Sequence, residues 1–172
     1  LTSTYSDLTE CNVFFVCIPT GIDENKLPEL EPLKNACKSL GKILKRGDIV
    51  IFESTVFPGA TEELCIPILE KYSMMKVNED FSVGYSPERI NVGDECHRIV
   101  STPKIISASN IESLNVMRNI YSTILDAPVI EASSIKIAET AKMYENVQRD
   151  VLIALANEYA DFCKSEGINI NE

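Results

Sequence analysis

Hydrophobic and polar positions along the chain fall into blocks that predict strands and helices in alternation. Continuous apolar runs bounded by turn residues are typical of strands buried on both faces of a sheet. The strands expected on this basis cover residues 12–18, 48–52, 81–85, 103–107 and 128–130. Apolar residues at helical spacing lie between these runs, at 30–44, from Gly59 onward and at 111–121. We expect Pro67 to kink the second of these helices. The alternation predicts an α/β fold with a parallel, doubly wound sheet.

Residues 133 to about 165 contain neither proline nor glycine and predict one long helix. A helix of roughly thirty residues would span roughly 45–50 Å, and Gly167 is expected to end it. Such a helix more often connects two domains or forms a dimer interface than lies inside a compact domain. We therefore expect a homodimer through this helix, with one domain at 1–131 and a second that starts at 132–172.

Composition argues against several classes of protein. The net charge of −10 argues against a nucleic-acid-binding surface, which needs clustered lysine and arginine. No apolar run approaches the about eighteen residues needed to span a bilayer, and residues 1–10 lack the basic and apolar regions of a signal peptide. We expect a cytoplasmic protein without membrane contact. The start at Leu1 rather than Met suggests a piece of a longer chain.

Six cysteines are scattered along the chain without a C-x-x-C spacing, and His97 is its only histidine. The spacing of a metal site is therefore absent, and no metal is expected. Reduced thiols are favoured over a disulfide framework. Cys17, Cys37 and Cys65 occupy apolar patterns, where we expect them to be buried as small hydrophobic residues.

Polar residues that could carry chemistry follow the ends of the predicted strands, where ligands bind in parallel α/β sheets. Pro87 prevents the preceding strand from continuing, so Glu88 is aimed into this region and is a candidate general base. Thr20 follows the first strand, and Ser54 and Thr55 follow the second. The alternatives are a solvated glutamate in a turn and simple helix capping by the two hydroxyl residues.

The long helix carries a second group of polar candidates. Lys142 and Asn146 are four residues apart and share a face, where an ammonium and an amide side by side suit an oxyanion. We interpret this face as an active-site wall, although a solvated charged face would have the same pattern. Its other residues are Ile135, Ala138, Glu139, Arg149, Ile153 and Asn157. The opposite face predicts the conventional packing surface, with Ile137, Ala141, Tyr144, Val151, Leu152, Leu155, Tyr159 and Phe162.

No G-x-G-x-x-G occurs in the chain, although a complete dinucleotide-binding fold would carry one after its first strand. Either the fold does not bind a nucleotide or its first half is missing. Four segments nevertheless resemble the UDP-glucose/GDP-mannose dehydrogenase family in their order and spacing. These segments are 16–20, 53–59, 85–94 and 133–139, the last continuing through Lys142, Asn146 and Arg149. Within the family, residues 87–91 with His97 and Arg98 are most similar to the branch that acts on UDP-N-acetylhexosamines.

The resemblance implies an oxidoreductase that uses NAD to convert the C6 alcohol of a nucleotide sugar to a carboxylate, through a thioester on a cysteine. Such enzymes serve polysaccharide biosynthesis. Thr55 and Glu88 would hold the reactive water, with Glu88 as the general base. Lys142 would stabilise the oxyanion, and Asn146 would orient the substrate and the alkoxide. The residues that would lie along NAD are Thr20, Ser54 and Thr55.

The UDP-sugar substrate would contact a second set of residues. The resemblance implies contacts from the backbone of Arg89, Ile90 and Asn91, in addition to Lys142 and Asn146. The side chains of Arg89 and Arg98 are weaker candidates for contacts with the sugar or its phosphates.

Departures from the family pattern limit what the chain alone is expected to do. The Gly-rich first half and the segment with the nucleophilic cysteine and its aspartate partner are absent, and none of the six cysteines matches that position. The chain thus resembles the second half of a Rossmann-like NAD domain at 1–131, followed at 132–172 by the interdomain helix that starts a central domain. We expect it to be inactive alone. The alternatives are a UDP-glucose or GDP-mannose dehydrogenase, a β-hydroxyacid-type dehydrogenase, and a non-catalytic dimerisation module.

Overall fold

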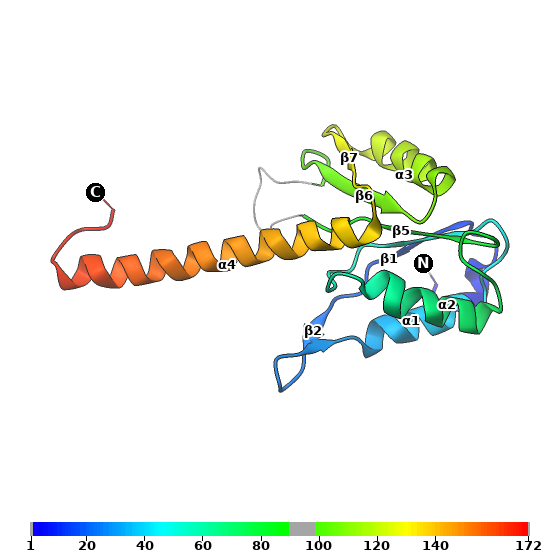
Figure 1. Cartoon of the computed structure of the whole chain (residues 1–172), viewed down its shortest axis with the longest axis horizontal. Coiled ribbons are helices and arrows are strands. Elements are labelled where there is room, and N and C mark those ends of the chain that lie inside the picture. Colours follow the sequence, from blue (N-terminus) through cyan, green and yellow to red (C-terminus); the bar gives the residue numbers. More distant parts are fainter. Residues whose placement is uncertain (1, 90–98, 172) are drawn as a thin grey trace.

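The computed structural model describes residues 2–89 and 99–171 of the chain. Among these residues, a five-stranded sheet has the strand order β1-β4-β5-β6-β7 (Figure 1). Its strands are β1 (Val13–Val16), β4 (Ile49–Phe52), β5 (Ser82–Tyr85), β6 (Lys104–Ala108) and β7 (Val129–Glu131). The helices are η1 (Tyr5–Leu8), α1 (Glu31–Gly41), η2 (Thr61–Cys65), α2 (Ile66–Ser73), α3 (Ile111–Ile124) and α4 (Ile135–Ser165). The predicted alternation of strands and helices is confirmed.

The sheet is mostly parallel, but its direction reverses between β5 and β6. β1, β4 and β5 run parallel, with Val16, Phe52 and Tyr85 in one row across the sheet. β6 pairs antiparallel with β5, with Gly84 opposite Ala108 and Tyr85 opposite Ser107, and β7 pairs parallel with β6. The expectation of a wholly parallel sheet is therefore wrong. Because an apolar run has the same pattern in either direction, the sequence did not reveal that β6 runs back along β5.

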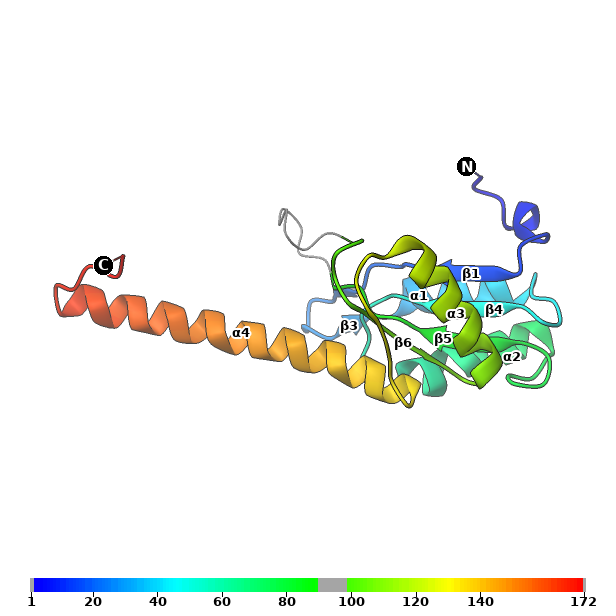
Figure 2. The ribbon, with the colours of Figure 1, turned by 90° about the horizontal axis from the view of Figure 1, so that it is seen from above.

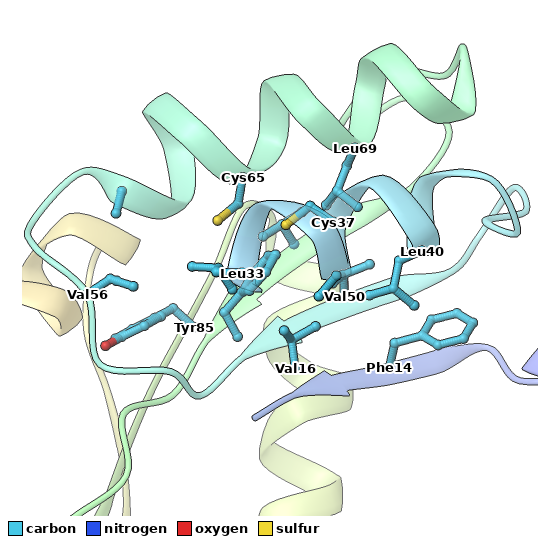
Figure 3. Packing of buried hydrophobic residues seen from close by; sticks show 14 of the residues in the cluster. Phe14, Val16, Leu33, Cys37, Leu40, Val50, Val56, Cys65, Leu69 and Tyr85 are labelled. Carbon is cyan, nitrogen blue, oxygen red and sulfur yellow. The ribbon is translucent and has the colours of Figure 1, made fainter. Parts of the chain in front are cut away.

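Helices cover both faces of the sheet, with α3 on one side of the strands and α1 and α2 on the other (Figure 1). On one face, α1, η2 and α2 enclose an apolar cluster that includes Val50 and Leu69 (Figure 3). On the other face, α3 encloses a smaller cluster with Ile51 and Met117. Gly84 on β5 permits this close packing, because a Cβ atom there would lie 2.3 Å from the sulfur of Met117. The adjacent residues Val50 and Ile51 thus fill opposite cores, as the period of a strand requires.

β1 forms one edge of the sheet and is open on one face. Phe15 is 43 % exposed, and the Tyr121 ring meets it edge-on at 6.0 Å between centroids. The expectation of a strand buried on both faces is wrong here, because α3 packs over β5, β6 and β7. Cys17, just beyond β1, is likewise exposed rather than buried, whereas Cys37 and Cys65 are buried as expected.

Two local features differ from the sequence prediction. An antiparallel hairpin of β2 (Gly21–Ile22) and β3 (Pro28–Glu29) follows β1 and was not anticipated. The chain changes from a π-helix, η2, to an α-helix, α2, at Ile66, so that Pro67 is the second residue of α2. The proline therefore follows a π turn instead of bending a continuous α-helix.

α4 is a single helix of 31 residues that extends away from the sheet, as predicted (Figures 1 and 2). Its first turns pack on β5, β6 and η2. The buried residues of α4 are Ile135, Ala138, Glu139, Lys142 and Cys163. No helix in the described ranges, α4 included, is long and apolar enough to cross a membrane.

The two faces of α4 are used differently from the prediction. Only the first turns of the mixed face, with Glu139 and Lys142, pack on the sheet, whereas Arg149, Ile153 and Asn157 further along this face are exposed. The apolar face is exposed apart from half-buried Ala141. Its exposed residues are Ile137, Tyr144, Val151, Leu152, Leu155, Tyr159 and Phe162. The prediction that this face packs is wrong within the described part of the chain, because the sheet meets only the first turns of the helix.

Candidate active site

A crevice of about 380 Å³ opens at the carboxyl ends of β1 and β4. Its lining residues are Cys17, Ile18, Pro19, Thr20, Glu53, Ser54, Thr55 and Glu88. The structure thus brings together Thr20, Ser54, Thr55 and Glu88, four of the residues expected at a functional site. This is the region of an α/β sheet in which ligands bind.

Hydroxyl groups link the two loops that line this crevice, one after β1 and one after β4. Ser54 Oγ accepts a hydrogen bond from the N–H of Ile18 at 3.0 Å and donates to the carbonyl oxygen of Val16 at 3.3 Å. Thr20 Oγ1 donates to the carbonyl oxygen of Thr55 at 2.7 Å. Ser54 is buried and Thr55 is exposed. η2 has no side-chain cap, so the helix-capping alternative is wrong.

Glu88 and Lys142 meet beside the crevice, although 54 positions separate them in the sequence. Nζ of Lys142 donates a hydrogen bond to the backbone carbonyl oxygen of Glu88. The side chain of Glu88 lines the crevice and is half-buried, and its Oε1 accepts the N–H of Arg89 at 2.6 Å. Glu88 is therefore not a solvated turn residue, and the amine and the acid occupy one region.

The side chain of Lys142 is held in an environment that disfavours its charge. Burial lowers its pKa below the ordinary value of 10.5, although the nearby carboxylates of Glu145 and Glu88 act in the opposite direction. Asn146 follows one turn later on the same face and is half-buried. A perturbed amine beside a crevice is a candidate for a functional group, because active sites are where such shifts concentrate.

Arg89 contacts α4 and does not line the crevice. Its Nε and Nη2 donate to the two carboxylate oxygens of Glu145 at 3.1 and 3.2 Å. A second hollow, of about 410 Å³, lies beside this ion pair. Its lining residues are Arg89, Thr102, Pro103, Glu145, Gln148, Arg149 and Leu152. Ile90, Asn91 and Arg98, expected near the sugar nucleotide, lie outside the described residues.

Glu139 joins α4 to the segment that follows β4. Its Oε2 accepts the N–H of Gly59 at 2.5 Å and its Oε1 accepts the N–H of Thr61 at 2.9 Å. The residue is fully buried. A carboxylate at a helix N-terminus satisfies orphan N–H groups and interacts favourably with the helix dipole. Lys142 lies one turn further along α4, so this contact also sets the position of its amine.

A cluster around the buried side chains of Lys104 and Tyr121 lies beside the crevice and was not expected from the sequence. β6 begins with Lys104, whose Nζ lies 3.2 Å from Glu53 Oε1 and donates to the carbonyl oxygen of Pro87 at 3.4 Å. The hydroxyl of Tyr121, on α3, donates to the same Glu53 oxygen, and its ring centroid lies 5.2 Å from the Lys104 amine. Cys17 Sγ donates to the other oxygen, Glu53 Oε2, at 3.6 Å.

The cluster keeps its thiol and its phenol protonated. Burial raises the pKa of the Tyr121 hydroxyl, and the Glu53 carboxylate raises it further. Cys17 is an exposed residue, but partial burial of its thiol and the same carboxylate raise its pKa, which the Lys104 amine lowers in part. The sequence held one signal for this cluster. Lys104 opens an apolar strand directly after a proline, and a lysine is seldom buried without a partner.

Comparison with known proteins identifies the family. Residues 1–125 match the NAD binding domain of the UDP-glucose/GDP-mannose dehydrogenase family, and residues 136–172 match the central domain of the same family. The chain belongs to the UDP-glucose/GDP-mannose dehydrogenase family. The resemblance seen in the sequence and the expectation of an NAD-binding domain are therefore confirmed.

Relatives within the UDP-glucose/GDP-mannose dehydrogenase family include enzymes named for N-acetylated sugars. The chain is 54 % identical over 168 residues to the UDP-N-acetyl-D-glucosamine 6-dehydrogenase of Pseudomonas aeruginosa, covering 98 % of this chain and 40 % of the relative. It is 49 % identical to the enzyme of the same name from Salmonella typhi, over 92 % of this chain and 37 % of the relative. A UDP-D-ManNAc dehydrogenase structure from Pyrococcus horikoshii superimposes with a TM-score of 0.90 at 32 % identity, over 99 % of this chain and 40 % of the chain of that structure. The chain thus spans about 40 % of the length of such relatives.

Proposed function

We propose that this chain is the middle part of an enzyme that oxidises the C6 alcohol of a UDP-N-acetylhexosamine to a carboxylate in the cytoplasm. The sugar alcohol, two NAD and one water would give the carboxylate, two NADH and three protons. Family membership and the names of its relatives support the reaction class. The observation that carries the proposal is the contact between the Lys142 amine and the Glu88 carbonyl beside the crevice.

The lining of the crevice suits one half of NAD. A doubly wound fold consists of two halves that each bind a mononucleotide. A volume of about 380 Å³ lies within the range of small-molecule pockets, with Ile18 and Pro19 as apolar walls and Thr20 and Thr55 as polar groups. When bound there, NAD would supply the acceptor for a hydride from the substrate carbon. Ser54 would contribute indirectly, because its buried hydroxyl holds the Ile18 loop in place.

Lys142 and Asn146 would act on the substrate oxygen. Their ammonium and amide groups would stabilise the negative charge that develops there, which is among the largest contributions a site can make. Arg89, Ile90 and Asn91 would contact the sugar nucleotide through their backbone.

Glu88 would act in the last step, when water attacks the thioester. Its carboxylate would accept a proton from that water while the Thr55 hydroxyl holds the water in place. The tetrahedral oxyanion, beside Lys142, would then collapse, break the carbon–sulfur bond and release the cysteine as a thiolate. The cysteine would belong to a part of the protein outside this chain.

The same proposal accounts for the open edge of the sheet. Among the described residues, β1 is paired with another strand, β4, on one side only. Its residue Phe15 is also exposed on one face of the sheet. In the order of a dinucleotide-binding sheet, the first half would place a further strand against this edge. The domain at 1–131 would then be the second half of a Rossmann-like fold, and α4 would lead into the next domain.

A homodimer through α4 is the second part of the proposal. Its exposed apolar face carries seven large side chains in the described structure, including Leu152, Leu155 and Phe162. A helix with so much exposed apolar surface is expected to be covered by another element or another chain. A purely non-catalytic dimerisation module would share this surface, but it would not need the Glu88 and Lys142 arrangement.

Steady-state assays of the full-length protein test the reaction and the substrate. NADH is followed with NAD and, separately, UDP-GlcNAc, UDP-GalNAc, UDP-ManNAc, UDP-glucose and GDP-mannose. We expect two NADH per UDP-N-acetylhexosamine consumed, and none from the chain 1–172 alone. One NADH per sugar would contradict the oxidation to a carboxylate. A higher kcat/KM for UDP-glucose or GDP-mannose would contradict the substrate assignment.

A further inference from the structure

Two amines hold successive carbonyl groups of the turn that carries Glu88. Nζ of Lys104 donates to the carbonyl oxygen of Pro87, and Nζ of Lys142 donates to that of Glu88. The amines come from β6 and α4, so two different elements hold the turn in place. Directly before the turn, the N–H of Ser86 donates a backbone hydrogen bond to the carbonyl oxygen of Phe52 at 2.9 Å. Pro87 has no N–H, so its carbonyl is the only backbone hydrogen-bonding group through which this residue can be held.

Lys104 differs from Lys142 in how firmly its amine is fixed. The side chain is 7 % exposed and its counterion, Glu53, is 15 % exposed. Glu53 is in turn held by the hydroxyl of Tyr121 and the thiol of Cys17. The Tyr121 ring also lies 5.2 Å from the amine, within the range of a cation–π contact. The Lys104 amine therefore has three direct neighbours that restrict its movement, namely the Glu53 carboxylate, the Pro87 carbonyl oxygen and the Tyr121 ring.

We infer that Lys104 is a positioning residue, which directs the Glu88 carboxylate toward the reactive water by holding the Pro87 carbonyl, with Glu53 as its fixed counterion. The inference rests on the proposed function of Glu88. When Lys142 turns to the substrate oxygen, Lys104 is the amine that keeps the turn in place. The antiparallel direction of β6 makes this possible, because it brings the first residue of β6 to the edge of the crevice rather than to the far end of the sheet.

Misplacement of a catalytic group by about 1 Å can cost on the order of 10²-fold in rate. We therefore expect Lys104→Met to slow thioester hydrolysis by about 10²-fold while KM and the hydride-transfer steps change little. Tyr121→Phe keeps the ring but removes the hydroxyl that holds Glu53, and we expect a smaller slowing of the same step. The matched control is Lys76→Met, which removes an exposed lysine paired with Glu70.

A double-mutant cycle in the full-length protein separates positioning from a merely structural role. The thioester-hydrolysis rate is measured in rapid-quench experiments for Lys104→Met, Glu88→Gln and the double variant. If Lys104 acts through Glu88, the double variant hydrolyses the thioester no more slowly than Glu88→Gln alone. Equal slowing by Lys104→Met in both backgrounds would overturn the inference, as would a change in KM alone or no change.

Two further controls keep the outcomes distinct. Circular dichroism melting of each variant shows whether it is folded, and if Lys104→Met does not fold, Tyr121→Phe replaces it in the cycle. If Tyr121→Phe then leaves hydrolysis unchanged, the inference is wrong. If Glu88→Gln itself does not slow hydrolysis, the proposed function of Glu88 fails, which is a different result from the failure of Lys104 to act through it.

Discussion

Replacing Glu139 with glutamine should lower the free energy of unfolding of the chain by about 2–3 kcal/mol. The carboxylate is fully buried and accepts the N–H groups of Gly59 and Thr61 at 2.5 and 2.9 Å. Glutamine retains one acceptor oxygen, and its NH₂ group would face a second N–H donor. Glu139→Gln therefore loses one bond outright and weakens the other.

The magnitude follows from the balance of three contributions. A hydrogen bond to a charged group contributes about 1.5–3 kcal/mol, and the negative charge at a helix N-terminus contributes about 0.5–2 kcal/mol more. The neutral side chain no longer requires burial of a charge, which offsets part of both losses. Glu62→Gln is the matched control, because Glu62 is an exposed acid in the first turn of η2. We expect its effect to be within about 0.5 kcal/mol.

Urea unfolding measures this difference directly. The chain has no tryptophan, so far-UV circular dichroism and tyrosine fluorescence serve as the two probes. Coincident unfolding transitions from the two probes indicate two-state behaviour. The free energy of unfolding is obtained from the midpoint urea concentration and from the slope of the free energy against urea concentration. A loss below about 0.5 kcal/mol for Glu139→Gln would refute the view that this carboxylate joins α4 to the sheet.

Two further predictions concern Lys142 and α4. Because burial lowers the pKa of Lys142, activity that needs its ammonium should fall as pH rises through that lowered pKa, at a lower pH than an exposed lysine would show. Lys142→Arg, whose charge persists, should remove this alkaline fall in kcat of the full-length protein, even if kcat itself drops; an unchanged profile would exclude the ammonium role. Leu152→Glu should convert a dimer of the chain to a monomer in light scattering after gel filtration, whereas Asp150→Asn, exposed on the same helix, should not. If the unmodified chain is itself a monomer in this measurement, the proposal that α4 is sufficient to form the dimer is wrong.

The sequence pattern predicted the helices and strands well, but it did not predict which surfaces meet. The apolar runs located β4 and β5, and the absence of helix breakers located α4. The direction of β6 was not encoded in its apolar pattern, so Lys104 was not expected near Glu88. The exposed face of α4 was predicted to pack, because a hydrophobic stripe reveals that a partner exists but not which partner covers it.

The candidate site was likewise predicted only in part from the sequence. Glu88 and Lys142 were both predicted as active-site residues, and the Lys142 amine donates a hydrogen bond to the backbone carbonyl oxygen of Glu88. Glu53, Lys104 and Tyr121 come from three separate segments, and no spacing along the chain marks them as neighbours. Their association depends on the reversal at β6 and on the packing of α3, which only the folded structure reveals.

Intact-mass measurement of the full-length Glu88→Gln protein tests the central claim most directly. The protein is incubated with NAD and the preferred UDP-N-acetylhexosamine, quenched in acid and weighed. With the general base removed, hydrolysis should slow by about 10²-fold or more, and a covalent adduct of the oxidised sugar nucleotide should accumulate after two NADH per site. A protein that turns over at the unmodified rate and carries no adduct would contradict the role of Glu88 beside Lys142.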